Sequence, residues 1–376
     1  ALGDKAMQPA TETYDVPRFL RQDDRVNDAL PFGSRGGASF RHYFPLDGEY
    51  RIKVRLQRDA LGDIVGITEP KQVEVRIDDA LVRQFAVGGE LGKFDDPGQS
   101  YARNADDGME FTLSVKAGPR TVAAIFRKSV LKPEGAVRER PRGDAFEGIG
   151  SVAITGPLKT TGLGNTPSRG RIFTCYPKGR EDEPICARQI LGKLSRQAYR
   201  RPVTDEDVKA LFALYEAGRR KGTFETGVQV AIEGLLSSPG FLFRTERDPV
   251  GAKPAQAYVV SDLELAARLS QFLWSSAPDS ELIELAAQGK LKESATLEKQ
   301  VRRMLADPKS SALVQNFAGQ WLYLRNMRTK YPDGSIFPEF DENLREAMIR
   351  QTEMFFASIL NEDRSVVDLL DADYTF

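Results

Sequence analysis

The stretch that decides the fold runs from Arg171 to Glu246 and reads RIFTCYPKGREDEPICARQILGKLSRQAYRRPVTDEDVKALFALYEAGRRKGTFETGVQVAIEGLLSSPGFLFRTE. It contains both cysteines of the chain and its first strong helical signals. It also separates a strand-rich N-terminal half from a helix-rich C-terminal half. We therefore predict a multidomain β plus α protein, in which an N-terminal antiparallel β-sandwich is followed by an all-α helical region.

Three helices are predicted inside this stretch. The first begins near Asp182, because Pro184 fits a first helical turn, where its missing N–H leaves no bond unmade. The second begins at Thr204 with a capping-box-like Thr-Asp-Glu-Asp sequence, ahead of an apolar stripe at helical spacing. The third ends at Ser238-Pro239-Gly240, which stops a helix.

The two cysteines, Cys175 and Cys186, lie eleven positions apart. This is too far for the C-x-x-C spacing of redox and zinc sites, and a single histidine in the chain argues against a Cys/His zinc site. We predict a disulfide that closes the loop between them, with two buried free thiols as the alternative. A disulfide would place the chain outside the reducing cytosol.

The sequence before this stretch predicts short strands, because apolar and polar residues alternate in runs such as Tyr50–Leu56, separated by Gly, Pro and Asp turns. The sequence after it predicts further helices, among them one capped by Ser261 and a long one from Asp341. Trp274 and Trp321 lie on helical stripes and are predicted to be core. The predicted segments are an extended lead-in (1–30), a β-sandwich domain (31–157), a linker (158–170), a helical domain with the disulfide (171–247) and a second helical domain (258–376).

Six segments of the chain resemble known sequences: LPFGSRGGASFRHYFPLDGEYRIKVRL (30–56), CARQILGKLSRQAYRRPVTDEDV (186–208), FETGVQVAIEGLLSSPGFLFRTE (224–246), SDLELAARLSQFLWSSAPDSELIELAAQGKL (261–291), NFAGQWLYLRNM (316–327) and SVVDLLDADYTF (365–376). These segments resemble a planctomycete-type family of large secreted proteins that carry c-type cytochrome modules. The family's other domains have no established activity. By this analogy the sandwich resembles a carbohydrate-binding module.

The chain departs from this family in two ways. It lacks the C-x-x-C-H haem-attachment site, so the resemblance implies no cofactor within this chain and haem c in a partner chain or missing module. Family members also continue past the final D-A-D-Y-T-F segment. We therefore expect this chain to be the middle portion of a larger protein, with the remainder, or a second polypeptide, continuing after Phe376.

Composition excludes some classes of function. Acidic and basic residues number 54 and 53, a balance that argues against nucleic-acid binding. No apolar run approaches the ~20 residues of a transmembrane helix. The N-terminus lacks the organisation of a signal peptide, so an exported protein would have a signal that was removed or lies upstream. We expect a bacterial periplasmic or extracellular location.

The candidate site residues lie in the predicted sandwich. His42 is the only imidazole of the chain and could be a haem ligand or a general base, with a structural histidine at the sandwich edge as the alternative. Tyr43, Phe44 and Tyr101 are candidates for stacking on sugars. Tyr43 and Tyr101, with Arg35 and His42, make up the candidate ligand-binding set. Asp47 and Glu49 offer oxygen ligands for a possible calcium ion. No catalytic residue can be assigned.

These observations predict a scaffold or binding portion of an exported, c-type-cytochrome-associated protein. The sandwich would contact glycan or a partner subunit, and the helices would dock the cytochrome or C-terminal modules. One alternative is part of a haem-dependent oxidoreductase that acts on an extracellular polymer. Another is a structural subunit of a larger membrane-attached complex, which would carry an extensive apolar interface on its outer helical faces.

Overall fold

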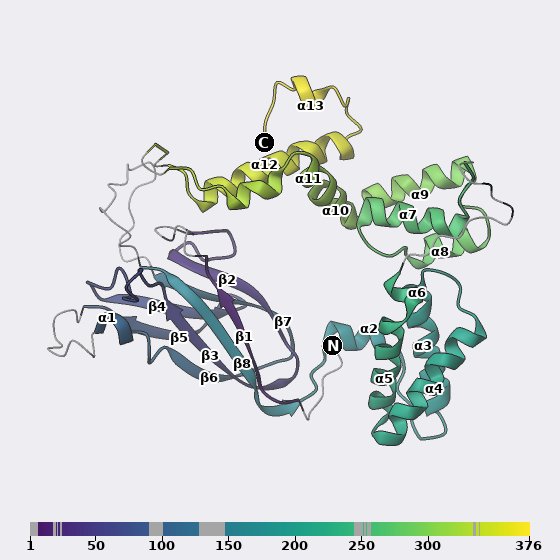
Figure 1. The fold of residues 1–376 in the computed structure, drawn as a ribbon, viewed down its shortest axis with the longest axis horizontal. Coiled ribbons are helices and arrows are strands. Elements are labelled where there is room, and N and C mark those ends of the chain that lie inside the picture. Colours follow the sequence, from purple (N-terminus) through teal and green to yellow (C-terminus); the bar gives the residue numbers. More distant parts are fainter. Residues whose placement is uncertain are drawn as a thin grey trace. The chain divides into compact units, whose positions relative to one another are not determined.

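The computed structural model describes residues 7–17, 20, 22, 25–89, 101–127, 147–243, 251, 253, 257–333, 336–337 and 339–376. The chain divides into two compact units. Their strands and helices are labelled in Figure 1. Unit 1 consists of residues 1–168 and 329–348, and unit 2 consists of residues 169–328 and 349–376.

Unit 1 is the predicted antiparallel β-sandwich. Its two four-stranded sheets have the strand orders β1-β8-β3-β6 and β2-β7-β4-β5. The elements are β1 (Ala10–Asp15), β2 (Ser34–Phe44), β3 (Asp47–Leu56), β4 (Lys71–Ile77), β5 (Ala80–Val87), α1 (Tyr101–Asn104), β6 (Glu110–Val115), β7 (Gly118–Arg127) and β8 (Ile149–Gly162). The two inner faces share one apolar core, which includes Phe44, Tyr50, Ile52, Val73, Val75, Phe126, Val152 and Ile154.

Strand β3 shows why the sequence folds in this way. Its residues Tyr50, Ile52, Val54 and Leu56 are buried, whereas the residues between them point away from the core. Since successive side chains of a strand point to opposite faces, this alternation places the apolar row inside and the Arg51–Arg55 charges outside.

Part of the predicted extended lead-in (1–30) is β1, a strand of the sandwich. This strand pairs with β8 along its full length, from Ala10 opposite Gly156 to Asp15 opposite Ser151. Because β1 is an edge strand and nearly all of it is exposed, it lacks the apolar alternation by which the other strands are recognised. The predicted linker (158–170) is also largely ordered structure, since β8 continues to Gly162 and α2 (Pro167–Ile172) follows.

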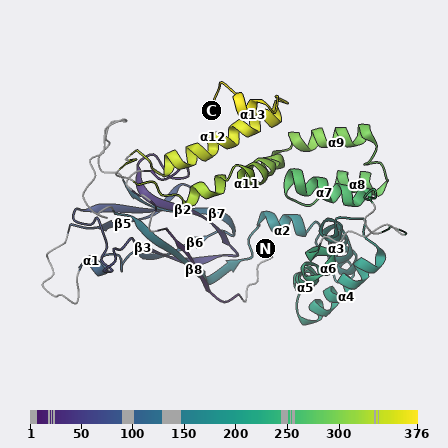
Figure 2. The same cartoon turned by 45° about the horizontal axis from the view of Figure 1, so that its top comes forward.

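Unit 2 is helical. The elements after α2 are α3 (Glu183–Tyr199), α4 (Asp205–Lys221), α5 (Phe224–Ser237), α6 (Pro239–Leu242), α7 (Asp262–Trp274), α8 (Ser280–Ala287), α9 (Ser294–Ala306), η1 (Pro308–Ser310), α10 (Ser311–Leu313), the π-helical turn η2 (Val314–Ala318), α11 (Gly319–Trp321), η3 (Leu324–Thr329), α12 (Glu342–Asn361) and α13 (Asp368–Asp371). Helices α3, α4 and α5 pack side by side (Figures 1 and 2). No described helix is both long enough and apolar enough to cross a lipid bilayer.

The predicted helix starts are confirmed. Thr204 accepts a hydrogen bond from the backbone N–H of Asp207, whose carboxylate accepts one from the N–H of Thr204, so the capping box is complete. Ser261 and Glu264 form the same arrangement at the start of α7. Pro184 occupies the first turn of α3.

The predicted disulfide is present, and it joins the segment before α3 to the first turn of that helix. The sulfur atoms of Cys175 and Cys186 are bonded at 1.99 Å, with their Cα atoms 5.9 Å apart.

The two tryptophans differ in their surroundings. Trp274 is core as predicted: it is 3% exposed, and its Nε1 donates a hydrogen bond of 2.8 Å to the carbonyl of Met304. Trp321 is 54% exposed, so the prediction that it belongs to the core is wrong. The reason is η2, where the π-helical turn adds a residue to the helix and rotates the side chains that follow by about 100°.

Residues 329–348 belong to unit 1, although the sequence predicts one helical domain over 258–376. Asn343 hydrogen-bonds to the backbone carbonyl of Arg25 in the sandwich unit. Nearby, the buried guanidinium of Arg345 lies 5.1 Å from the ring centroid of Tyr331 and 5.0 Å from that of Phe340. The predicted domain is therefore divided between the two units.

Candidate functional site

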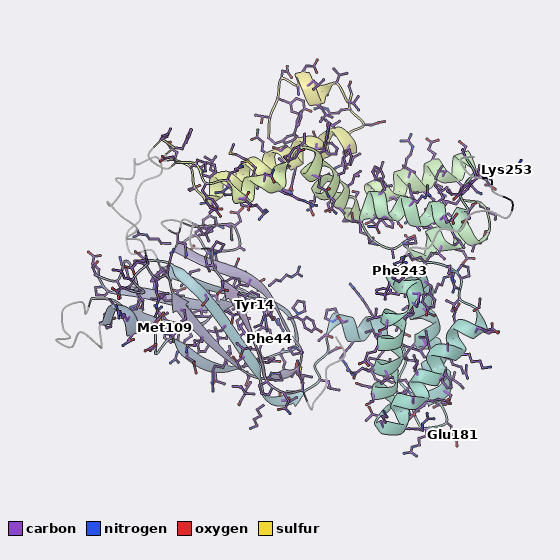
Figure 3. All side chains as sticks on the ribbon, viewed as in Figure 1. Tyr14, Phe44, Met109, Glu181, Phe243 and Lys253 are labelled. Carbon is purple, nitrogen blue, oxygen red and sulfur yellow. A yellow bond between two sulfur atoms is a disulfide. The ribbon has the colours of Figure 1, made fainter. Side chains whose placement is uncertain are left out.

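His42 lies at the edge of the sandwich and connects the two sheets. Its Nδ1 is 2.9 Å from the hydroxyl of Tyr14 and 3.2 Å from a carboxylate oxygen of Glu12, both on β1. Its ring packs edge-on against Phe44, with 4.4 Å between centroids (Tyr14 and Phe44 are labelled in Figure 3). The side chain is buried. This geometry corresponds to the structural alternative for His42.

The pH dependence of this contact is a first prediction. Burial lowers the pKa of His42 below its usual value, and the nearby Glu12 carboxylate offsets only part of this effect. A group whose pKa is depressed on folding contributes stability above its unfolded pKa of about 6.5 and loses it as the pH falls. We expect unit 1 to lose stability as the pH falls below about 6.5, and we expect His42→Gln to weaken this dependence. Urea unfolding of the wild type and of His42→Gln, measured above and below about pH 6.5, checks this prediction. Equal slopes of unfolding free energy against pH for the two proteins would contradict it.

The other predicted ligand-binding residues do not gather around His42. Tyr43 points to the opposite face of β2, because it is the next residue of the strand. Arg35 forms an ion pair with Glu147 at 3.3 Å. The hydroxyl of Tyr101 accepts a 2.7 Å hydrogen bond from the N–H of Gly88. The predicted set is therefore distributed over several parts of the sandwich.

The possible calcium ligands gain no support from the geometry. One carboxylate oxygen of Asp47 accepts from the N–H of Ala117 at 2.8 Å, and the other from Lys116 Nζ at 2.9 Å. These bonds hold the pKa of Asp47 below its usual value despite partial burial. The described residues contain no group of three or more His, Cys, Asp or Glu side chains arranged to bind a metal. Calcium at Asp47 and Glu49 stays an untested prediction.

A buried carboxylate that the sequence does not single out organises one end of the sandwich. Asp106 is fully buried and accepts hydrogen bonds from Arg55 Nη1 (2.7 Å), from both terminal nitrogens of Arg58 (2.9 and 3.0 Å) and from the N–H of Leu56 (2.8 Å). Burial alone would raise the pKa of Asp106, but these bonds outweigh it and hold the pKa below its usual value. The carboxylate is therefore ionised and fixes both arginines.

The two arginines line a polar pocket on the sandwich. The pocket has a volume of about 410 Å³ and is lined by Asp15, Val16, Arg55, Leu56, Gln57, Arg58, Gly150 and Ser151. Asp15 lies opposite Ser151 in the β1–β8 pair, and Ser151 lies opposite Arg55 in the β8–β3 pair. One carboxylate, one hydroxyl and one guanidinium thus form a row across three strands.

The second notable feature is an aromatic surface on unit 2, formed by Phe272, Phe317 and Trp321. These side chains are 59%, 48% and 54% exposed. The ring of Phe317 lies 6.4 Å from Phe272 and 5.9 Å from Trp321, measured between centroids. It also lies 6.3 Å from Phe356 on α12.

Polar groups border the aromatic surface. The side chain of Asn316 donates a 2.8 Å hydrogen bond to the hydroxyl of Ser275 and accepts one of 3.1 Å from Arg325. The apolar centre and polar border match the general organisation of a protein–protein interface.

A larger cavity in unit 2, of about 620 Å³, lies between α12 and the segment from α9 to η2. Two arginines stand at its border, and both already have acidic partners: Arg302 pairs with Glu298 at 3.0 Å and Arg350 with Glu353 at 3.8 Å. This compensation leaves no clear charge preference for a ligand.

Comparisons with known proteins identify related sequences for the helical part. Residues 186–246 match a family model described as PSD5, a protein of unknown function (DUF1595), and residues 260–376 match one described as PSD4, a protein of unknown function (DUF1592). No curated protein matches the chain. Among solved structures, the native structure of a family 35 carbohydrate binding module from Clostridium thermocellum matches 39% of this chain and 98% of its own, with 8% identity and a TM-score of 0.20.

The two family matches confirm the part of the predicted resemblance that concerns domains of unknown function. The predicted link to c-type cytochromes stays a prediction. The helical part of this chain is thus similar, over residues 186–246 and 260–376, to two families to which no activity has been assigned.

Proposed function

We propose that this chain is a non-catalytic scaffold or binding portion of an exported protein. Its sandwich contacts glycan or a partner subunit, and its helical unit docks a c-type cytochrome module or C-terminal modules. The observation that carries this proposal is the aromatic surface of Phe272, Phe317 and Trp321.

The chemistry of this surface favours a protein partner. Phenylalanine and tryptophan are enriched in the buried centres of interfaces, where a few such residues supply most of the binding energy. Here the three rings are neighbours, yet about half of each side chain remains exposed to solvent. Since contiguous exposed apolar patches often mark interaction sites, a docked module would remove an unfavourable exposure.

The disulfide between Cys175 and Cys186 supports export, because disulfides persist mainly in oxidising compartments. We therefore propose a periplasmic or extracellular location. The haem is proposed to reside in the partner, since the only histidine of this chain is buried and already contacts Tyr14 and Glu12.

The docking proposal predicts a large effect of the double variant Phe317→Ala/Trp321→Ala. When the tagged chain is purified from its native host, we expect a haem-bearing partner to co-purify, visible as a Soret band. Because truncation of central aromatic residues typically removes at least ~2 kcal/mol of binding energy, the double variant should retain less than a tenth of that absorbance.

Phe243→Ala is the matched control, because Phe243 is 64% exposed and lies at the end of α6, outside the aromatic surface. It should retain the wild-type amount of haem. Unchanged circular dichroism will show that the double variant is folded. A haem partner that the double variant retains in full would refute the docking surface, and a wild-type preparation without haem would refute the cytochrome partner.

The same surface also supports the structural-subunit alternative, which requires an apolar interface on the outer helical faces. Separation of membrane and soluble fractions distinguishes the cytochrome-docking proposal from the structural-subunit alternative. A chain that sediments with membranes through its partners, and is released by Phe317→Ala/Trp321→Ala without any haem signal, would favour the structural subunit.

A further inference from the structure

We infer that the polar pocket of the sandwich, at the ends of β1, β8 and β3, is a binding subsite for a neutral, hydroxyl-rich saccharide. This inference rests on the glycan contact proposed for the sandwich and adds the site and the class of sugar. The binding groups are Asp15, Ser151, Arg55 and Arg58, none of which belongs to the predicted ligand-binding set.

The register places these groups where one ligand can reach them all. Asp15, Ser151 and Arg55 occupy matching positions on three adjacent strands, so their side chains project from the same face of the sheet. The outer strands of the row are about 10 Å apart, since neighbouring strands are spaced ~4.8 Å. The pocket volume of about 410 Å³ lies within the usual range for small-molecule sites.

The arginines are held in place before any ligand arrives. Arg55 bonds to Asp106 and Asp107 through Nη1 alone, so among the described residues its Nε and Nη2 retain N–H groups for a ligand. Arg58 is fixed by two bonds to Asp106 and one of 2.9 Å to the carbonyl of Arg103. Groups fixed in this way lose little side-chain entropy when they bind.

The charges decide the class of ligand. Two guanidinium groups are balanced by Asp106 and Asp107, which contact them directly, and by Asp15, whose carboxylate has no partner among the described residues. The local charge is therefore slightly negative, which disfavours an acidic sugar. A neutral sugar fits, because each hydroxyl can donate to the Asp15 carboxylate or accept from an arginine N–H.

The experiment measures binding of the whole chain to soluble xylan, galactomannan and β-glucan, with polygalacturonate as the acidic comparison. Affinity electrophoresis and calorimetry provide the readouts. We expect at least one neutral polymer to bind, and we expect Ser151→Leu, which fills the pocket while both arginines and their aspartate partners stay in the chain, to weaken binding at least tenfold. Asp15→Asn should weaken it about threefold to tenfold.

Ala153→Leu is the matched control. It lies on the same strand and face as Ser151, outside the pocket lining, and should bind within twofold of wild type. Wild-type affinity in Ser151→Leu would overturn this subsite while leaving the glycan contact of the sandwich intact. Preference for polygalacturonate would overturn the neutral class. Absence of binding to every neutral polymer would overturn both this inference and the proposed glycan contact, without affecting the helical docking surface.

Discussion

Asp106→Ala is expected to lower the free energy of unfolding of the sandwich unit by about 3–5 kcal/mol, the usual effect of removing one partner of a buried ion pair. The substitution leaves the guanidinium groups of Arg55 and Arg58, and the N–H of Leu56, without their shared acceptor. Urea unfolding at neutral pH, followed by circular dichroism, measures the loss.

Asp107→Ala supplies the comparison for this prediction. Asp107 neighbours Asp106 and also contacts Arg55 at 2.7 Å, but its side chain is largely exposed, so its loss should cost less than about 1 kcal/mol. Equal losses of unfolding free energy in Asp106→Ala and Asp107→Ala would show that the burial of Asp106 does not increase its contribution to stability. The wild type should also lose this contribution in acid, because the pKa of Asp106 is depressed in the folded state and its carboxylate protonates as the pH falls.

The second large effect is expected from removal of the disulfide. Cys175→Ser/Cys186→Ser should lower the stability of unit 2 by about 2–3 kcal/mol, because the unfolded chain regains the freedom of a loop of this length. Unfolding midpoints measured with and without dithiothreitol check this. The reductant should destabilise the wild type and leave the double variant unchanged, and a wild type indifferent to reduction would refute the prediction.

Local signals in the sequence predict much of this fold. The capping boxes at Thr204 and Ser261 form as expected, because all their groups lie within one helical turn. The alternation of apolar and polar residues around Tyr50 likewise predicts the buried face of β3, because the apolar residues of a single strand all lie on one face. The burial of Trp274 is predicted correctly from its helical spacing. The burial predicted for Trp321 is not observed, because a π-helical turn interrupts the periodicity on which that prediction depends.

The candidate sites depend on contacts between distant parts of the chain, and the sequence does not predict them. Asp106 meets Arg55 across 51 positions, and nothing in the Asp106-Asp107 pair distinguishes a buried acceptor from an ordinary turn residue. Asp15 joins the polar pocket only because β1 pairs with β8, and β1 has no apolar pattern. His42 is the exception, because the sequence singles it out as the only imidazole of the chain; in the structure it contacts Tyr14, Glu12 and Phe44.

Because unit 1 comprises residues 1–168 and 329–348, neither unit can be obtained by a single cut of the polypeptide. During synthesis the sandwich strands are complete before residues 329–348, which include Asn343, leave the ribosome. The carbonyl of Arg25 therefore lacks its Asn343 partner until the helical residues 169–328 have been made. A fragment ending at residue 168 should consequently be more susceptible to proteases near Arg25 than the intact chain, and adding the peptide 329–348 in trans should restore its protection.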